Sequence, residues 1–438
     1  MARMHSWEWV ETQVARSMEA WRRCPSQSEL PGPAFTPKEQ RKREEAYDAA
    51  LREVEREVKR PPRTRAGRLA AQDRITESFA RFSAAALGLE AKAIDLLTLG
   101  FLPVGRRFAQ WARQFDSGLS MSDIVQACRN TWTACGLQPL LGDALALTPS
   151  IVGYSLLYPY TDNYLDCEDV TAREKACFNE RFRFRLRGHW GPARNRREYA
   201  VWSMVSLIEQ QYPRSSFPEV YDCLLAIHRA QEESVSQLKN SGEGSQIDEL
   251  SISCAKGGTS VLADACLSHG WLGEEEAIFA FDWGVLLQLG DDLQDVREDL
   301  KRGSVTLFTR AAMAGEPLDG LATQLLNRSE QVSDRMDRLP HGSRVLKELL
   351  RMSWHSLILM AIADSQKYFS RGFLARAESH SPFRFGFLRA RRDRLSGRRG
   401  LYARLFDAFL EPREEPGPAR RTPEGDRAGT FSSLAVSN

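Results

Sequence analysis

Asp291, Asp295 and Asp299 recur at four-residue intervals after an apolar run, residues 277–289, whose hydrophobic positions have helical spacing. That spacing predicts a helix on which the three carboxylates share one face. Gly303 is expected to end this helix as a C-cap. Such a row of carboxylates either binds a cation or forms an acidic surface exposed to solvent.

The acidic stretch is unfavourable as a purely structural element. Like charges four residues apart destabilise a helix by about 0.2–0.5 kcal/mol per pair, and carboxylates near a helix C-terminus oppose its dipole by about 0.3–1 kcal/mol each. Asp292 and Glu298 add further negative charge. Residues that disfavour the helix in which they lie tend to occur at functional sites, so this stretch is a candidate site. The simpler alternative is an acidic face exposed to solvent.

A second acidic cluster also closes an apolar helical run. Asp162, Asp166 and Asp169 fall on one helical face, in a segment expected to begin at Thr148-Pro149 with an N-cap and a first-turn proline. Two such faces could point at each other across a cavity. Carboxylate oxygens suit Mg²⁺, which proteins usually hold with a few carboxylates and the phosphates of a substrate. The two clusters therefore predict a magnesium-dependent diphosphate site.

These motifs resemble those of the class I isoprenoid synthases. Residues 162–166 are similar to the first aspartate-rich motif of that superfamily, in the D-x-x-x-D form of squalene and phytoene synthases. Residues 288–295 resemble the Q-x-x-D-D-x-x-D second motif of trans-prenyl diphosphate synthases, and residues 295–303 resemble the D-V-x-E-D-x-x-x-G tail of phytoene synthases. The motifs lie 129 residues apart (291 minus 162), a separation similar to the family's. The resemblance covers about residues 75–370.

The resemblance implies an all-α fold, a helical bundle around a central cavity. It also implies three Mg²⁺ ions and the ionisation of a prenyl diphosphate with release of pyrophosphate. The residues implied to be catalytic are Asp162, Asp166, Asp291 and Asp295. The implied metal ligands are Asp162, Asp166, Asp291, Asp292, Asp295 and Asp299. The residues implied to bind substrate are Tyr158, Lys256, Gln288, Lys301 and Arg302.

Several residues outside the two motifs have open interpretations. Lys256 precedes a Gly-Gly pair, and each glycine in a helix costs about 1 kcal/mol relative to alanine. We expect a break there, either a turn between two helices or an opened helix whose backbone and Lys256 meet the diphosphate. Arg129 either contacts the diphosphate or lies on the surface. Tyr158 shares a helical face with Asp162 and is either a core residue or, as the resemblance to prenyl synthases implies, part of the floor of the cavity. Pro159 is expected to kink that helix.

Departures from the family's patterns leave the reaction open between cyclisation and condensation. No arginine pair closely follows Asp166, which counts against chain elongation, and aspartates replace the Asn-Ser-Glu metal triad of terpene cyclases. Two other classes stay open. One is a catalytically silent prenyl-lipid-binding or partner subunit with the same fold. The other is a helical interaction protein whose acidic helix ends are only solvated.

Composition indicates a globular protein and identifies no partner. The 438 residues are 42% hydrophobic and 27% charged, with a net charge of +2. The eight cysteines show no C-x-x-C pair and no His/Cys ligand spacing, so we expect free thiols in a reducing compartment, mostly in the core. No apolar stretch is long enough to span a membrane, and Glu8, Glu11 and Glu19 argue against a signal or transit peptide. We expect a cytoplasmic protein, with peripheral membrane contact and homodimer formation both open.

Four segments are expected along the chain. Residues 1–67 are a charged, proline-containing extension that caps the domain, touches a partner or is disordered. Residues 68–370 form the isoprenoid synthase-like helical domain, and residues 412–438 form a disordered tail. Residues 371–411 are a basic aromatic segment, with ten arginines against Glu378 and Asp393 by residue 404. Such a segment suits nucleic acid, an anionic membrane surface or a lid, and the upstream motifs favour a lid or membrane contact, with no nucleic acid.

Overall fold

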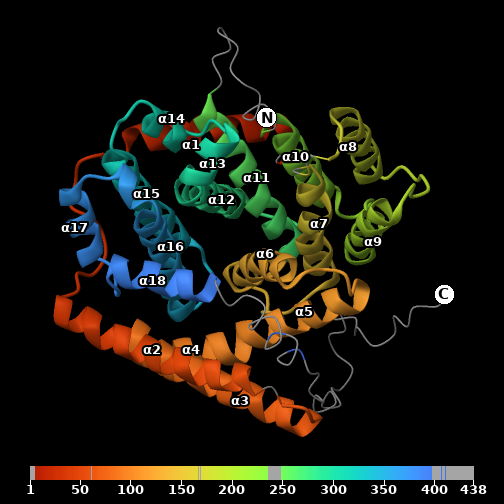
Figure 1. Ribbon diagram of the computed structural model, residues 1–438. Helices are drawn as coiled ribbons and strands as arrows, with labels where there is room; N and C mark the ends of the chain where they lie inside the picture. The colour runs from red at the N-terminus through yellow and green to blue at the C-terminus, as the bar shows by residue number, and fades with distance from the viewer. Residues whose placement is uncertain are drawn as a thin grey trace.

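The computed structural model describes residues 5–60, 62–165, 167, 169–234, 248–396, 406 and 410. Every regular element in these ranges is a helix, which confirms the predicted all-α class (Figure 1). The expected disordered tail at 412–438 and the candidate ligand Asp166 lie outside the described residues.

The longer helices are α1 (Trp7–Arg23), α2 (Pro37–Lys59), α3 (Arg65–Phe82), α5 (Leu102–Phe115), α6 (Met121–Leu140), α7 (Pro149–Leu165), α8 (Ala172–Leu186), α9 (Arg196–Gln211), α10 (Pro218–Ser234), α11 (Glu249–His269), α12 (Glu274–Gln294), α15 (Asp319–Arg338), α16 (Arg344–Asp364), α17 (Arg371–Ser379) and α18 (Phe385–Ser396). The shorter ones are η1 (Ser83–Leu87), α4 (Ala91–Asp95), η2 (Leu96–Phe101), α13 (Val296–Arg302), α14 (Leu307–Met313) and η4 (Gln366–Tyr368).

Helices α11 and α12 lie at the centre of the molecule, with the other long helices around them (Figure 1). α11 packs against α1, α6, α7 and α10 as well as α12, and α12 packs also against α15 and α16. Both helices are apolar on most sides, which is the pattern of a helix enclosed by others. The helices that carry the two acidic motifs, α7 and α12, therefore share α11 as a common neighbour.

The close approach of α11 to α12 depends on glycines. The break predicted at Gly257 and Gly258 is wrong, because α11 runs without interruption through both residues. A Cβ atom on Gly257 would overlap the backbone of Gly284 and the side chain of Gln288, and one on Gly258 would overlap the ring of Phe281. The glycines therefore let two helix backbones touch, and this packing offsets their low helix propensity.

The second acidic motif spans two helices instead of the single helix that the sequence predicts. α12 ends just before Asp295, which adopts φ −93° and ψ 6°, and α13 begins just after it. The Asp295 amide donates to the Asp291 carbonyl oxygen at 2.8 Å, and the Asp299 amide donates to the Asp295 carbonyl oxygen at 2.9 Å. The four-residue spacing thus continues through the junction. Gly303 ends α13 at φ 70°, which confirms the predicted C-cap.

Helix α1, within the segment of residues 1–67, packs against the helical domain, as the capping alternative expects for this part of the segment. Trp9, Val10 and Trp21 of α1 are buried in the hydrophobic cluster that also contains the core of α11 and α12. Ser6 begins the helix as its N-cap, since its hydroxyl accepts a hydrogen bond from the amide of Trp9. α1 therefore belongs to the main core.

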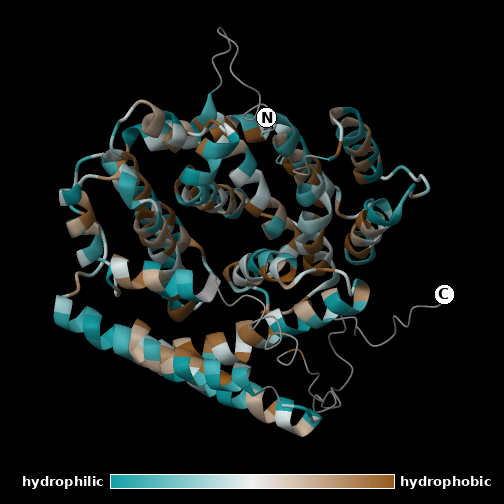
Figure 2. Cartoon of the chain, in the orientation of Figure 1, coloured by the Kyte–Doolittle hydropathy of each residue, from teal (hydrophilic) through white to brown (hydrophobic). Residues whose placement is uncertain are grey.

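The described part of the basic segment is packed and paired. Phe373 and Phe385 are buried in the main hydrophobic cluster. Three ion pairs connect arginines in or beside α18 to α2: Arg384–Glu44 at 2.5 Å, Arg391–Asp48 at 2.5 Å and Arg394–Glu55 at 2.7 Å. These contacts dock α18 on α2, a helix with a largely hydrophilic surface (Figure 2). No helix in the described part of the chain combines the length and apolarity needed to cross a membrane.

Candidate active site

The junction of α12 and α13 brings together the three carboxylates that the sequence predicted to share a face. Burial raises the pKa of Asp291 to about 6, with Asp292 and Asp295 adding to the rise and Arg129 opposing it. Burial also raises the pKa of Asp299 to about 6, and the same two neighbouring aspartates add to it. The pKa of Asp295 is raised mainly by burial. These carboxylates disfavour one another's charge, and a divalent cation held among them would relieve that repulsion.

Asp291 is reached by water even though the surrounding protein limits its hydration. Its side chain is 55% exposed, yet burial is the largest cause of its raised pKa. The two observations describe different things, because a water molecule can touch a carboxylate that has protein on its other sides. Asp291 can therefore both receive a ligand from solvent and hold it in weakly hydrated surroundings.

Asp292 has a different environment from its neighbours. It is buried, and its carboxylate accepts hydrogen bonds from the Ser253 hydroxyl (2.6 Å) and the Gln288 side-chain amide (2.8 Å). Ser253 belongs to α11, so this carboxylate faces the neighbouring helix. The arrangement engages both Asp292 oxygens and suits a residue that fixes the position of α12 and of Gln288.

Three cations act on the carboxylate cluster. The charge of Lys256 on α11 lowers the pKa of Asp291 and Asp299, and Arg302 on α13 lowers that of Asp295 and Asp299. Arg129 reaches across from α6 and places Nη2 3.6 Å from Asp291 Oδ1. By contrast, Lys301 is bound by the exposed Glu298 at 2.9 Å. Of the two basic residues predicted after the motif, Arg302 is thus the one that influences the cluster electrostatically.

The first motif lies at the C-terminal end of α7, which begins at Pro149 as predicted and continues through Pro159. Asp162 is half-buried, and its Oδ1 accepts hydrogen bonds from Gln231 on α10 (3.2 Å) and from the Thr161 hydroxyl (3.1 Å). One turn earlier, Tyr158 is 39% exposed. The predicted proximity of Tyr158 and Asp162 along one helical face therefore holds.

One face of α6 contacts both motif helices. Asp123 accepts a hydrogen bond from Asn163 on α7 at 3.1 Å, and Gln126 donates to the Tyr158 hydroxyl at 3.0 Å. Arg129, three residues further along, pairs with α12. The spacing of three residues keeps these α6 side chains on one face. The first and second motifs therefore lie beside the same helix, and α6 supplies polar residues that the sequence analysis did not assign.

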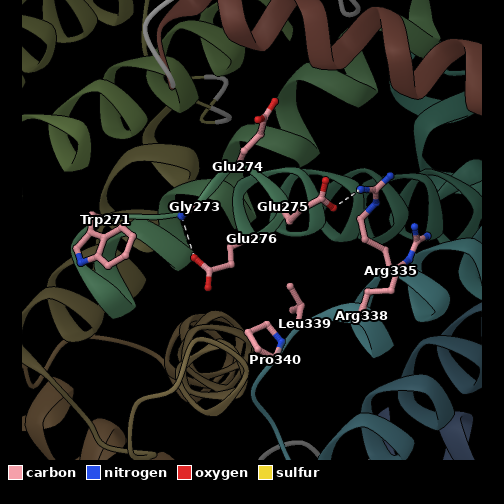
Figure 3. Close-up of a pocket in the computed structure, with 9 residues that line it drawn as sticks. All are labelled: Trp271, Gly273, Glu274, Glu275, Glu276, Arg335, Arg338, Leu339 and Pro340. Atoms are coloured by element: carbon pink, nitrogen blue, oxygen red, sulfur yellow. Dashed lines mark hydrogen bonds and ion pairs between the residues drawn. The ribbon is translucent and has the colours of Figure 1, made fainter.

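Two surface recesses in the described residues lie away from the acidic motifs. One, of about 470 Å³, is lined by residues that include Trp271, Glu275, Arg335 and Pro340 (Figure 3). It lies at the N-terminal end of α12, and 16 residues of helix (291 minus 275) place Asp291 roughly 24 Å away. The other, of about 790 Å³, lies beside Leu30, Asp319 and His380. Neither contains a residue predicted to bind substrate, so the central cavity stays a prediction.

A further group of potential ligands was missed because its members are far apart in sequence. His5, Cys223 and Cys266 are buried together, and their ligand atoms lie within 4.8 Å of one another. Short Cys and His spacings are the usual sequence signal of such a group, and these three residues have none. No family model, curated protein or solved structure matches this chain.

Proposed function

We propose that this protein is a Mg²⁺-dependent class I isoprenoid synthase that ionises a prenyl diphosphate and then cyclises or condenses the allylic cation. The supporting observation is the cluster of Asp291, Asp295 and Asp299 beside the cations Arg129, Lys256 and Arg302. A site made only of carboxylates would repel a diphosphate, and a site made only of basic side chains would bind it without a metal ion. Their mixture suits a diphosphate that is bound partly through Mg²⁺ and partly through direct ion pairs.

The residues divide into groups with different roles. Asp291, Asp295 and Asp299 would hold Mg²⁺ from one side and Asp162 from the other, together with Asp166 by resemblance to the family motif. Bound Mg²⁺ supplies positive charge that stabilises a departing diphosphate. Asp292 and Gln288, which hydrogen-bond each other, would position the helix that carries the ligands.

The cations would take part of the diphosphate's charge. Lys256 and Arg302 are close enough to the cluster to lower aspartate pKa values, so they can also reach anions held there. Arg129 is separated from Asp291 by 3.6 Å, longer than a typical charge-assisted hydrogen bond of about 2.8 Å. Its guanidinium is therefore held loosely and can turn to the diphosphate when Mg²⁺ binds Asp291. Tyr158, exposed one turn before Asp162, would contact the prenyl chain.

The test is pyrophosphate release from farnesyl, geranylgeranyl and longer prenyl diphosphates, with and without Mg²⁺. We expect metal-dependent release that falls by about 100-fold or more in an Asp291→Asn/Asp295→Asn variant, since single groups that stabilise developing charge are often worth that much. Glu298→Gln is the matched control, because Glu298 is an exposed acid on α13 that pairs with Lys301. Extracted products would then distinguish cyclisation from condensation.

The alternative is a catalytically silent prenyl-lipid-binding or partner subunit. It predicts a Mg²⁺- and prenyl diphosphate-dependent thermal shift without any pyrophosphate release. Absence of both responses in folded protein would reject both functions and leave the acidic helix ends as solvated surface.

A further inference from the structure

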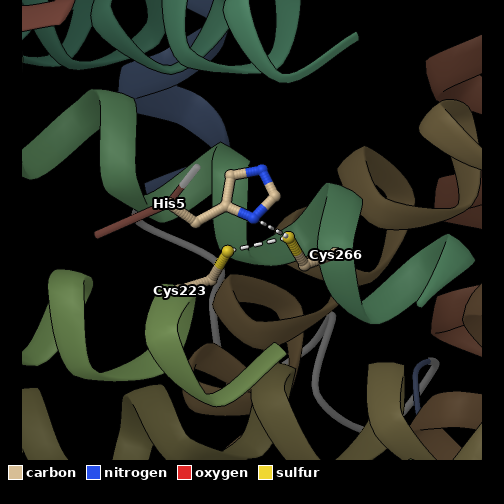
Figure 4. A group of neighbouring side chains, drawn as sticks. All are labelled: His5, Cys223 and Cys266. Carbon is tan, nitrogen blue, oxygen red and sulfur yellow. Dashed lines mark hydrogen bonds between the residues drawn. The ribbon is translucent and has the colours of Figure 1, made fainter. Parts of the chain in front are cut away.

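Three side chains from distant parts of the chain meet in the interior, away from the proposed diphosphate site. His5 precedes α1, Cys223 lies on α10 and Cys266 lies on α11 (Figure 4). All three are buried, with relative exposures of 1%, 0% and 0%. The Cys223 and Cys266 sulfur atoms are 2.7 Å apart, and His5 Nδ1 lies 4.0 Å from Cys266 Sγ.

This arrangement is unfavourable for two neutral thiols and a neutral imidazole. Sulfur atoms at 2.7 Å are closer than an ordinary non-bonded contact allows. His5 Nε2 has no hydrogen-bond partner among the described residues, although it is buried. It is Nδ1, not this nitrogen, that faces Cys266 (Figure 4). Some further interaction is therefore expected to hold the three groups together.

The local electrostatics favour a thiolate beside an imidazole. Burial opposes ionisation of Cys266, but hydrogen bonds with Cys223 and His5 lower the pKa of its thiol, whereas burial raises the pKa of the Cys223 thiol. Burial likewise opposes the protonation of His5, and contact with Cys266 raises its pKa overall. The charge of Glu219, one turn before Cys223 on α10, acts on all three groups. A cation placed among these donors would be attracted by the thiolate and by this carboxylate.

We propose that His5, Cys223 and Cys266 bind a Zn²⁺ ion, with a water molecule at the fourth position. Two thiolates and an imidazole are borderline-soft ligands, which favour Zn²⁺ over the hard ion Mg²⁺. A tetrahedral site with Zn–S bonds of about 2.3 Å separates its two sulfurs by about 3.7 Å. The cysteine side chains therefore move apart by about 1 Å on binding.

A disulfide between Cys223 and Cys266 is the competing state, with sulfurs about 2.05 Å apart. It would explain the short sulfur contact, but it would leave the buried imidazole without a role. A zinc ion would use both sulfurs and His5 Nδ1, the atoms that face one another in this group. The disulfide and the zinc site also differ in the number of titratable thiols, so thiol titration distinguishes them.

The zinc would join the N-terminal segment to α10 and α11. Ten residues of continuous helix separate Cys266 from Lys256, about 15 Å along α11. The site is therefore distinct from the proposed diphosphate site and does not depend on that function. The free energy of binding this ion would stabilise the folded chain, because the three ligands come together only when the protein is folded.

The test uses the full chain without a histidine tag, purified in the absence of chelators. We expect one equivalent of zinc per chain by elemental analysis. Zinc removal should lower Tm, and readdition should restore it. Replacement by Co²⁺ should give a thiolate-to-cobalt charge-transfer band and the visible bands of a tetrahedral ion.

Matched variants assign the ligands. Cys266→Ser and His5→Gln should each lower zinc affinity by at least tenfold, whereas Cys254→Ser should leave it unchanged. Cys254 is the suitable control, because it is a fully buried cysteine on the same helix outside the group.

Two outcomes would overturn the proposal. The first is folded wild-type protein that holds no stoichiometric zinc and gives no thiolate-to-cobalt band. The second is a Cys223–Cys266 disulfide in peptide mapping, with two fewer titratable thiols than the eight cysteines of the chain. Both readouts use the wild-type protein, so they remain decisive if Cys266→Ser does not fold.

Discussion

The Arg129 guanidinium lies 3.6 Å from the Asp291 carboxylate, across the interface between α6 and α12. Arg129 thus pairs with an aspartate of the second motif and does not stand alone on the surface. It opposes the rise in the pKa of Asp291 that burial causes. Both side chains are more than half exposed, so the pair sits where a ligand from solvent can separate it.

We expect Arg129→Gln to weaken diphosphate binding. A hydrogen bond to a charged group contributes about 1.5–3 kcal/mol, which corresponds to a loss of roughly 10- to 150-fold in kcat/KM for pyrophosphate release. The effect should appear mainly in KM, because Arg129 would bind the diphosphate before and after ionisation. Arg351→Gln is the control, since Arg351 pairs with Asp337 at 2.7 Å outside the site. If the two variants have the same kcat/KM for pyrophosphate release, Arg129 does not bind the diphosphate.

The stability of the metal-free protein should depend on pH through Asp291. Its folded pKa of about 6 is above the ordinary value of 3.8, so the fold favours the protonated form. The resulting stability is fully present below the unfolded pKa and is lost as pH rises through about 6. Without Mg²⁺, Asp291→Asn should therefore raise Tm relative to wild type near pH 7.5, and the gain should shrink towards pH 5.

Mg²⁺ should reverse this pattern, because the ion requires ionised carboxylates. Wild-type protein should gain stability from Mg²⁺ near pH 7.5 and lose that gain as pH falls through about 6. Glu298→Gln provides the comparison, since a hydrogen bond from Lys301 lowers the pKa of Glu298. A Tm difference between Asp291→Asn and wild type that does not vary with pH would contradict the raised pKa.

Gly284→Ala should destabilise the fold by about 1–3 kcal/mol, the usual cost of forcing atoms into a packed interface. An added Cβ would overlap the backbone of Gly257 on α11. Gly290→Ala on the same helix meets nothing within 4 Å and should be neutral or stabilising by up to about 1 kcal/mol. Denaturant unfolding of the two variants measures the difference. Similar free energies of unfolding for the two variants would show that α11 and α12 can move apart without loss of stability.

Asp282→Asn should be strongly destabilising. This buried carboxylate pairs with Arg328 at 2.8 Å, with Arg335 at 3.1 Å and with Arg16 at 3.1 Å, which joins α12 to α15 and α1. Removing one partner of a buried ion pair costs about 3–5 kcal/mol, because the remaining charges lose their compensation.

The surface pair Asp337–Arg351 is the comparison for Asp282. Asp337→Asn should change the free energy of unfolding by no more than about 1 kcal/mol, since its side chain is 49% exposed. Thermal or urea unfolding would measure both variants. The argument for Asp282 fails if the two substitutions have the same effect.

The amino-acid sequence by itself determined the local features of this protein. The helical class follows from apolar periodicity, and the start of α7 at Pro149 and the end of α13 at Gly303 follow from the backbone preferences of proline and glycine. The four-residue spacing of the aspartates was likewise readable, because helical geometry fixes which neighbours share a face. These features depend on interactions within a few residues of the chain.

Tertiary structure alone decided the relationships between distant segments. A Gly-Gly pair weakens an isolated helix, but in α11 it becomes a packing surface because α12 lies against it. Three arginines of the basic segment, Arg384, Arg391 and Arg394, pair with acids of α2, more than 300 residues earlier in the chain. His5 and Cys266 meet across 261 residues of sequence. No local pattern encodes such contacts, because they depend on how complete helices pack around one shared core.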